Sequence, residues 1–61
     1  MILRDVLNRF DNDTEIKLFD DDGVLIKYTF ADVHEEKYDY CEVIFPISVK
    51  NNKVEIWIET R

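Results

Sequence analysis

The chain has 61 residues, a formal net charge of −6 at pH 7, 46% hydrophobic residues and a single cysteine. This length predicts one domain, residues 1–61, and a lone cysteine excludes an intramolecular disulfide. The negative charge argues against direct binding to nucleic acid, which depends on Lys and Arg, but permits binding to a basic surface on another protein.

Residues 2–10 are expected to form an amphipathic helix, because their apolar side chains recur at helical spacing along one stripe. The members of this stripe are Ile2, Leu3, Val6, Leu7 and Phe10. The same segment is too charged to be the apolar part of a signal peptide, and no run approaches the ~18 apolar residues of a membrane span. We therefore expect a cytoplasmic protein without a membrane segment.

The next part of the chain predicts a β-hairpin. Residues 11–14 (DNDT) favour turns and end the helix. Residues 14–19 and 24–30 have the alternation of strands, and Asp22-Gly23 supplies the turn between them, because glycine tolerates a positive φ.

A polar connection, residues 31–40, leads to a second hairpin. Asp32 followed by Glu35 matches a helix cap, so a short helical turn is expected in this connection. Residues 41–49 and 53–59 alternate as two further strands, with KNNK as the turn between them.

These elements predict an α+β fold, with one N-terminal helix packed on a four-stranded antiparallel sheet made of two hairpins. Proline cannot donate a hydrogen bond to a neighbouring strand, so Pro46 places the third strand at an edge. The strand order 2-1-4-3 meets this condition and keeps every neighbouring pair antiparallel. The order 1-2-3-4 is an alternative, in which Pro46 would lie in a β-bulge.

Alternation along the strands divides the sheet into two faces. The expected members of the inner face, under the helix, are Ile16, Leu18, Ile26, Tyr28, Phe30, Val43, Phe45, Ile47, Val49, Val54, Ile56 and Ile58. The outer face is expected to be polar. It nevertheless carries a set of apolar residues: Phe19, Leu25, Ile44, Pro46 and Trp57.

The apolar residues of the outer face are a candidate partner-binding surface, because tryptophan is enriched among residues that dominate binding energy. We expect the apolar anchors to be Trp57, Ile44 and Leu25. We expect charge complementarity to a basic partner from Glu55, Glu59 and Glu15. The alternative is that these apolar residues are scattered singly and have no function, as on many protein surfaces.

The stretch ADVHEEKYDYC contains the only histidine and the only cysteine, His34 and Cys41. Both residue types bind zinc, but a closed zinc site needs four ligands and one chain offers one of each. A homodimer that pools both pairs, or a site completed by carboxylates, would meet this requirement. The alternative is a plain polar connection, with a surface histidine and a small apolar cysteine. No pattern here predicts catalysis, so we expect no enzyme activity and no cofactor other than zinc.

The opening LRDVLNRFDNDTEIKLFDDDG resembles short, acidic, uncharacterised proteins encoded by phages and mobile elements of Gram-positive bacteria. Those proteins share a layout of helix, acid-rich turn, T-x-I-x-L-x-D-x-DG hairpin, D-V connection and two closing strands. The matching positions are Thr14, Ile16, Leu18, Asp20, Asp22, Gly23, Asp32 and Val33. The resemblance implies a protein of the bacterial host cell. One function that it implies is inhibition of a bacterial defence system, as by anti-CRISPR proteins that act on a Cas effector.

The sequence therefore predicts a non-enzymatic protein-binding module, with a phage-encoded inhibitor as its leading form. The alternative is a small metal-binding or structural homodimer that uses His34 and Cys41. The motifs behind the resemblance are turn and strand patterns, so they transfer no active site.

Overall fold

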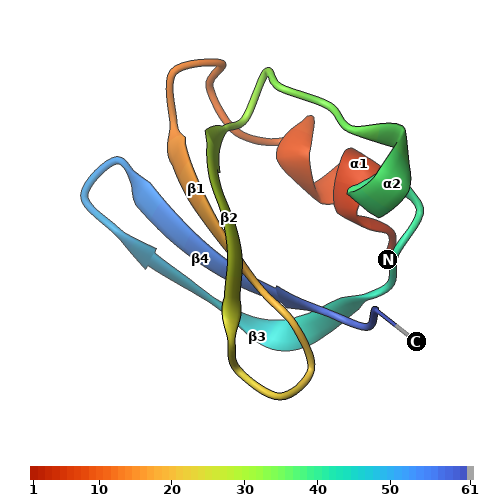
Figure 1. Ribbon diagram of the computed structural model, residues 1–61. Helices are drawn as coiled ribbons and strands as arrows, with labels where there is room; N and C mark the ends of the chain where they lie inside the picture. Colours follow the sequence, from red (N-terminus) through yellow and green to blue (C-terminus); the bar gives the residue numbers. More distant parts are fainter. Residues whose placement is uncertain (61) are drawn as a thin grey trace.

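The computed structural model describes residues 1–60, except for the side chain of Phe45. The bounds of its elements are α1 Leu3–Leu7, β1 Glu15–Phe19, β2 Leu25–Phe30, α2 Glu36–Asp39, β3 Val43–Lys50 and β4 Lys53–Ile58. The two helices lie together on one face of a curved, four-stranded sheet (Figure 1). The α+β class is confirmed. Beside the predicted N-terminal helix, the helical turn expected in the connection forms a second short helix, α2.

The core lies between the helices and the inner face of the sheet. Its buried apolar members are Leu3, Val6, Leu7, Ile16, Leu18, Ala31, Val43, Val54, Ile56 and Ile58. In β1 and β4 every second residue is buried, as the sequence predicts, because alternate side chains of a strand point to opposite faces.

The strand order is β2-β1-β4-β3, which confirms the predicted order. The expectation that all neighbours are antiparallel is wrong, because β1 and β4 run parallel. β2 ends at the Phe30–Glu15 pair, whereas β3 begins at the opposite end of the sheet, at the Val43–Ile58 pair. Residues 31–42 therefore cross the length of the sheet, and we call them the crossover. A connection of about a dozen residues is what a parallel arrangement needs.

The pairing of β1 with β2 is irregular and leaves Ile26 as an extra residue. An extra residue reverses the faces of the strand beyond it. Tyr28 and Phe30 are therefore 49% and 43% exposed on the outer face, where the sequence predicts core positions. Lys27 and Thr29 point inward in their place.

The pairing of β3 with β4 is irregular between Ile44 and Ser48. Pro46 lies in this interval at the edge of the sheet, where its missing N–H costs no ladder hydrogen bond. Val49, a predicted core residue, is 62% exposed, although its partner Val54 on β4 is buried.

The helices begin and end differently from the prediction. After Leu7, the chain tightens into a turn with bonds three residues apart, such as the Arg9 amide to the Val6 carbonyl at 3.1 Å. α2 begins after Glu35 without a side-chain cap, so the predicted cap at Asp32 is wrong. The amide of Asp32 instead donates to a carbonyl in the loop before β1. Neither helix of residues 1–60 has the length and apolar content to cross a membrane.

The segment before α1 adds a fifth, one-residue strand, because Ile2 pairs antiparallel with Glu42. Two backbone hydrogen bonds secure this pairing. The Leu3 amide donates to the Cys41 carbonyl at 2.9 Å, and the Val43 amide donates to the Met1 carbonyl at 2.8 Å. The start of α1 is thereby attached beside the start of β3.

Candidate functional site

The outer face is the surface of the sheet opposite to α1 and α2. Strand pairing aligns one apolar residue from each strand in a line across this face. These four residues, here called the apolar row, are Leu25 of β2, Phe19 of β1, Trp57 of β4 and Ile44 of β3. The three predicted anchors therefore lie in one continuous row, with Phe19 as a fourth member.

The aromatic residues of the outer face are in mutual contact. The rings of Phe19 and Trp57 stack with centroids 4.9 Å apart and an interplanar angle of 17°. Both side chains are partly exposed, and Leu25 is 50% exposed. Tyr28 and Phe30 continue the apolar surface along β2, and their rings meet edge to face at 6.5 Å. The apolar surface thus crosses all four strands and continues along the edge strand β2.

One border of the apolar row is acidic. Its members, here called the acidic margin, are Asp20, Asp21, Asp22, Glu42 and Glu59. The aspartates form the turn after β1. The two glutamates lie opposite each other, because the Glu59 amide donates to the Glu42 carbonyl at 2.9 Å. The Thr60 hydroxyl donates to Asp21 Oδ1 at 3.4 Å and so joins the two halves of the margin.

The other border of the apolar row is an open hollow of about 440 Å³ with mixed charge. Its charged lining consists of Lys17, Lys50, Lys53, Glu15 and Glu55. Glu15 accepts a hydrogen bond from the Tyr28 hydroxyl at 2.5 Å and lies 3.8 Å from Lys53 Nζ. The hydrogen bond to Glu15, together with desolvation, raises the pKa of Tyr28 above its ordinary value.

The three predicted acids therefore differ in what they offer a partner. Glu59 is exposed in the acidic margin, and Glu55 lies on the outer face next to Trp57 along β4. Glu15 already has two partners within the chain. Glu55 and Glu59 are thus better placed than Glu15 to bind a cationic group.

The three aspartates of the acidic margin are explained first by the turn that they build. Asp20 Oδ1 accepts hydrogen bonds from the amides of Asp22 and Val24, each at 2.9 Å. Gly23 has φ +83°, a backbone conformation that other residues adopt at a cost. The three aspartates are also close enough together to share a metal ion. Among residues 1–60, they are the one group of three or more His, Cys, Asp or Glu side chains for which this is true.

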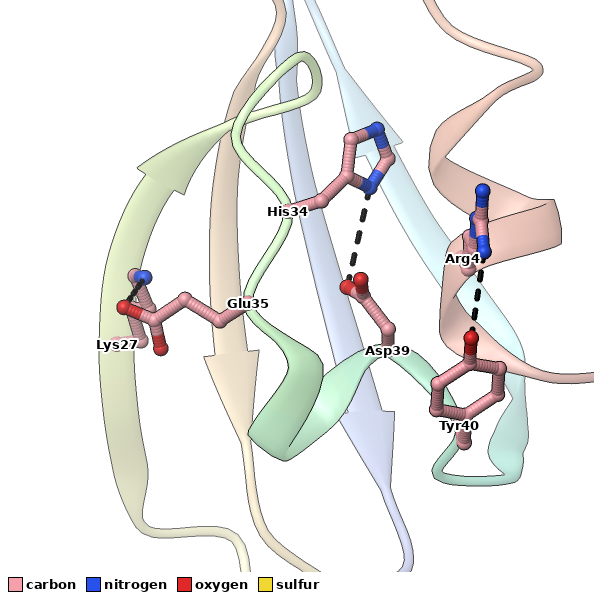
Figure 2. A network of polar contacts seen from close by, with 6 residues as sticks. All are labelled: Arg4, Lys27, His34, Glu35, Asp39 and Tyr40. Atoms are coloured by element: carbon pink, nitrogen blue, oxygen red, sulfur yellow. Dashed lines mark hydrogen bonds and ion pairs between the residues drawn. The ribbon is translucent and has the colours of Figure 1, made fainter.

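The predicted pair of His34 and Cys41 is not part of any such group in residues 1–60. The Cys41 thiol donates to the Lys37 carbonyl at 3.9 Å, and its side chain packs against the core. Figure 2 shows His34 turned toward α2, where its Nδ1 lies 3.8 Å from Asp39 Oδ1. In the structure, His34 therefore faces the carboxylate of Asp39 and not the thiol of Cys41.

Three residues of these surfaces were outside the sequence-based site. Tyr28 and Phe30 were missed because the extra residue in β2 depends on pairing with β1, which no pattern in the strand itself records. Asp39 was missed because a buried aspartate in an acid-rich stretch looks like its exposed neighbours. Phe19 shares the alternation of Glu15 and Lys17, so the sequence placed it on the outer face but did not single it out as an anchor.

Comparisons with known proteins identify no relative of this chain. No protein-family model, curated protein or solved structure matches the chain.

Proposed function

We propose that this protein is a non-enzymatic binding module whose outer face docks on a basic surface of another protein. The observation that carries this proposal is the apolar row, which crosses all four strands beside the acidic margin. An apolar centre that excludes water supplies binding energy, and a charged border supplies complementarity and faster encounter. The partner that fits is a cationic surface with an apolar patch.

The apolar row supplies the anchor of the proposed contact. Trp57 is held by its stack on Phe19, so it loses little conformational freedom on binding. Leu25, half exposed, lies at the open edge of the row. Large aromatic residues held in this way are the ones that dominate interface energies.

The charge of the molecule favours a cationic partner. The net charge is −6, and the acidic margin concentrates negative charge along one border of the row. Protein grooves that bind nucleic acid present the Lys and Arg side chains that such a border attracts. We therefore propose a nucleic-acid-binding defence effector, such as a Cas effector, as the partner class. The protein would act as a phage-encoded inhibitor in the cytoplasm of the bacterial host.

Docking through the face is favoured over pairing through an edge strand. On β2, the extra residue Ile26 distorts the edge, and Lys27 points inward to pair with Glu35 (Figure 2). On β3, Pro46 and the irregular pairing interrupt the other edge. Prolines, bulges and inward charges are the devices by which proteins prevent edge-to-edge pairing.

The first test measures binding of purified Cas effectors from Gram-positive bacteria by biolayer interferometry, together with inhibition of their DNA cleavage. Trp57→Ala should weaken binding by about 2 kcal/mol, roughly 30-fold, because it removes the central anchor. Leu25→Ser changes a half-exposed side chain and should weaken binding without affecting the fold. Raising the salt concentration should weaken binding of the wild-type protein, since charged borders are screened.

Val33→Ser is the matched control, because Val33 is 41% exposed in the crossover and not on the outer face. It should leave affinity and inhibition unchanged. Equal loss in Val33→Ser and Leu25→Ser would contradict docking through the apolar row. If no effector with a basic groove binds the wild-type protein, the proposed partner class is wrong.

A second candidate function is a structural homodimer that shares a zinc ion through His34 and Cys41. The observation in its favour is that both residues belong to the crossover and are at least partly exposed. Two chains would supply the four ligands of a closed site. Native mass spectrometry with and without a chelator tests this candidate. A zinc-bound dimer that disappears in Cys41→Ser supports it, and a metal-free monomer rules it out.

A further inference from the structure

Asp39 of α2 is a buried carboxylate with an unsatisfied oxygen. Its side chain is only 10% exposed. Its Oδ1 is shielded from solvent and has no hydrogen-bond partner among the described residues. Burial of a charged carboxylate without partners is unfavourable, and buried polar atoms are almost always satisfied by a donor or a cation.

The cationic side chains around Asp39 are engaged elsewhere. Figure 2 shows Lys27 paired with Glu35 on one side, and Arg4 donating to the Tyr40 hydroxyl at 3.3 Å on the other. The ammonium group of Lys37 lies over the ring of Tyr38, at 5.3 Å from its centroid. None of these three cations is therefore the partner of Asp39 Oδ1.

The side chain that faces Asp39 is His34. The distance of 3.8 Å from His34 Nδ1 to Asp39 Oδ1 is too long for a hydrogen bond, and the two groups form an ion pair only when the imidazole is protonated. The distance matches two ligands of one metal ion, because bonds of about 2.0–2.2 Å to nitrogen and oxygen place the two ligand atoms roughly 3–4 Å apart. His34 keeps 34% of its side chain exposed, so an ion can reach the space between the two residues from solvent.

We propose that His34 Nδ1 and Asp39 Oδ1 bind one divalent transition-metal ion, with Zn²⁺ as the best-fitting species and water in the remaining positions. Imidazole and carboxylate are both ligands of zinc, and the ion would satisfy the buried oxygen. The site differs from the pair of His34 and Cys41, since it needs no thiol and no second chain. A bound ion would tie the start of the crossover to α2. The inference does not depend on the docking proposal, because the outer face contributes no ligand.

Isothermal titration of the full chain with Zn²⁺ at neutral pH tests the site. The wild-type protein should bind one ion per chain through this pair. His34→Gln and Asp39→Asn should each weaken zinc binding by at least about tenfold, the loss that even outer partners of a metal ligand cause. Circular dichroism establishes that each variant is folded, and the exposed His34→Gln decides the test if Asp39→Asn unfolds.

Two control variants separate this site from the other candidate ligands. Cys41→Ser and Asp21→Asn should bind zinc as the wild-type protein does. With Co²⁺ as a spectroscopic probe, the complex should lack thiolate-to-metal charge-transfer absorption. Zinc affinity retained in His34→Gln overturns the proposal, as does loss of affinity in Cys41→Ser or Asp21→Asn. Absence of binding up to about millimolar Zn²⁺ overturns the proposal too, because a dissociation constant above about 1 mM corresponds to a binding free energy weaker than about −4 kcal/mol.

Discussion

At the scale of single residues, the hydrogen bond from Tyr28 to Glu15 leads to a predicted pH dependence. The bond, 2.5 Å long, raises the pKa of Tyr28, because the carboxylate disfavours the phenolate. The folded-state pKa then lies above the unfolded value of about 10, so the unfolded chain loses its proton first as the pH rises. The stabilisation from this bond is complete below about pH 10 and disappears as the pH passes the folded-state pKa.

Two variants check this prediction. Glu15→Gln should lower the pKa of Tyr28 toward its ordinary value, measured from the ring-carbon NMR signals. Tyr28→Phe should remove this part of the alkaline loss of stability in urea unfolding. The ring-carbon chemical shifts of Tyr40 at neutral pH should be the same in wild type and Glu15→Gln, because its hydroxyl contacts Arg4. An unchanged titration of Tyr28 in Glu15→Gln would show that the carboxylate is not the cause.

At the scale of elements, one inward-pointing charge on the edge strand β2 protects it from pairing with a second chain. Lys27 lies on the inner face opposite Leu18 and pairs with Glu35 of the crossover. A second chain that paired with this edge would have to accommodate the charge, which disfavours edge-to-edge association. Lys27→Val should therefore increase concentration-dependent association, measured by sedimentation velocity.

Glu35→Gln is the control for this effect, because it removes the ion pair and keeps the lysine charge. It should associate no more than the wild-type protein. When the Lys27→Val variant associates, hydrogen exchange of the backbone amides of β2 should slow, because the backbone groups at its free edge become paired with the second chain. Equal association in both variants would point to loss of the ion pair, and not to the edge charge.

At the scale of the whole molecule, the acidic margin opposes folding, and it is also the charged border of the contact that we propose with a cationic partner. Glu59 and Glu42 lie directly opposite each other, and like charges in that position destabilise a sheet. The Met1 ammonium, 2.8 Å from Glu42 Oε2, offsets part of this repulsion. Glu59→Lys should therefore raise the free energy of unfolding by about 0.2–1 kcal/mol at low salt, with a smaller gain at higher salt. The same variant should weaken binding to a basic partner. Urea unfolding and interferometry measure the two effects.

Asp32→Lys is the control for net charge, because it makes the same charge change at an exposed position in the crossover. It should raise stability less than Glu59→Lys does. Equal gains would mean that overall repulsion, and not the Glu42–Glu59 pair, limits stability.

The sequence alone determined those features that belong to a residue or to its near neighbours. The two-residue period of β1 and β4 predicted their buried positions, because side-chain alternation is a local property of a strand. Pro46 placed β3 at an edge, because a missing N–H belongs to the residue itself. The same alternation placed Trp57, Ile44 and Leu25 on one face. It could not show that they line up, since that depends on the register of three strand pairs.

The tertiary structure decided the features that depend on contacts between distant parts of the chain. The parallel pairing of β1 and β4 follows from the path of the crossover along the sheet, which has no signature in either strand. The extra residue Ile26 exists only relative to β1, yet it exchanges the two faces of β2 and brings Tyr28 to the surface. Asp39 is buried because α2 packs beside α1. In each case the packed molecule selects one arrangement among several that local propensity allows, because pairing and burial contribute more free energy than a single strand or turn can.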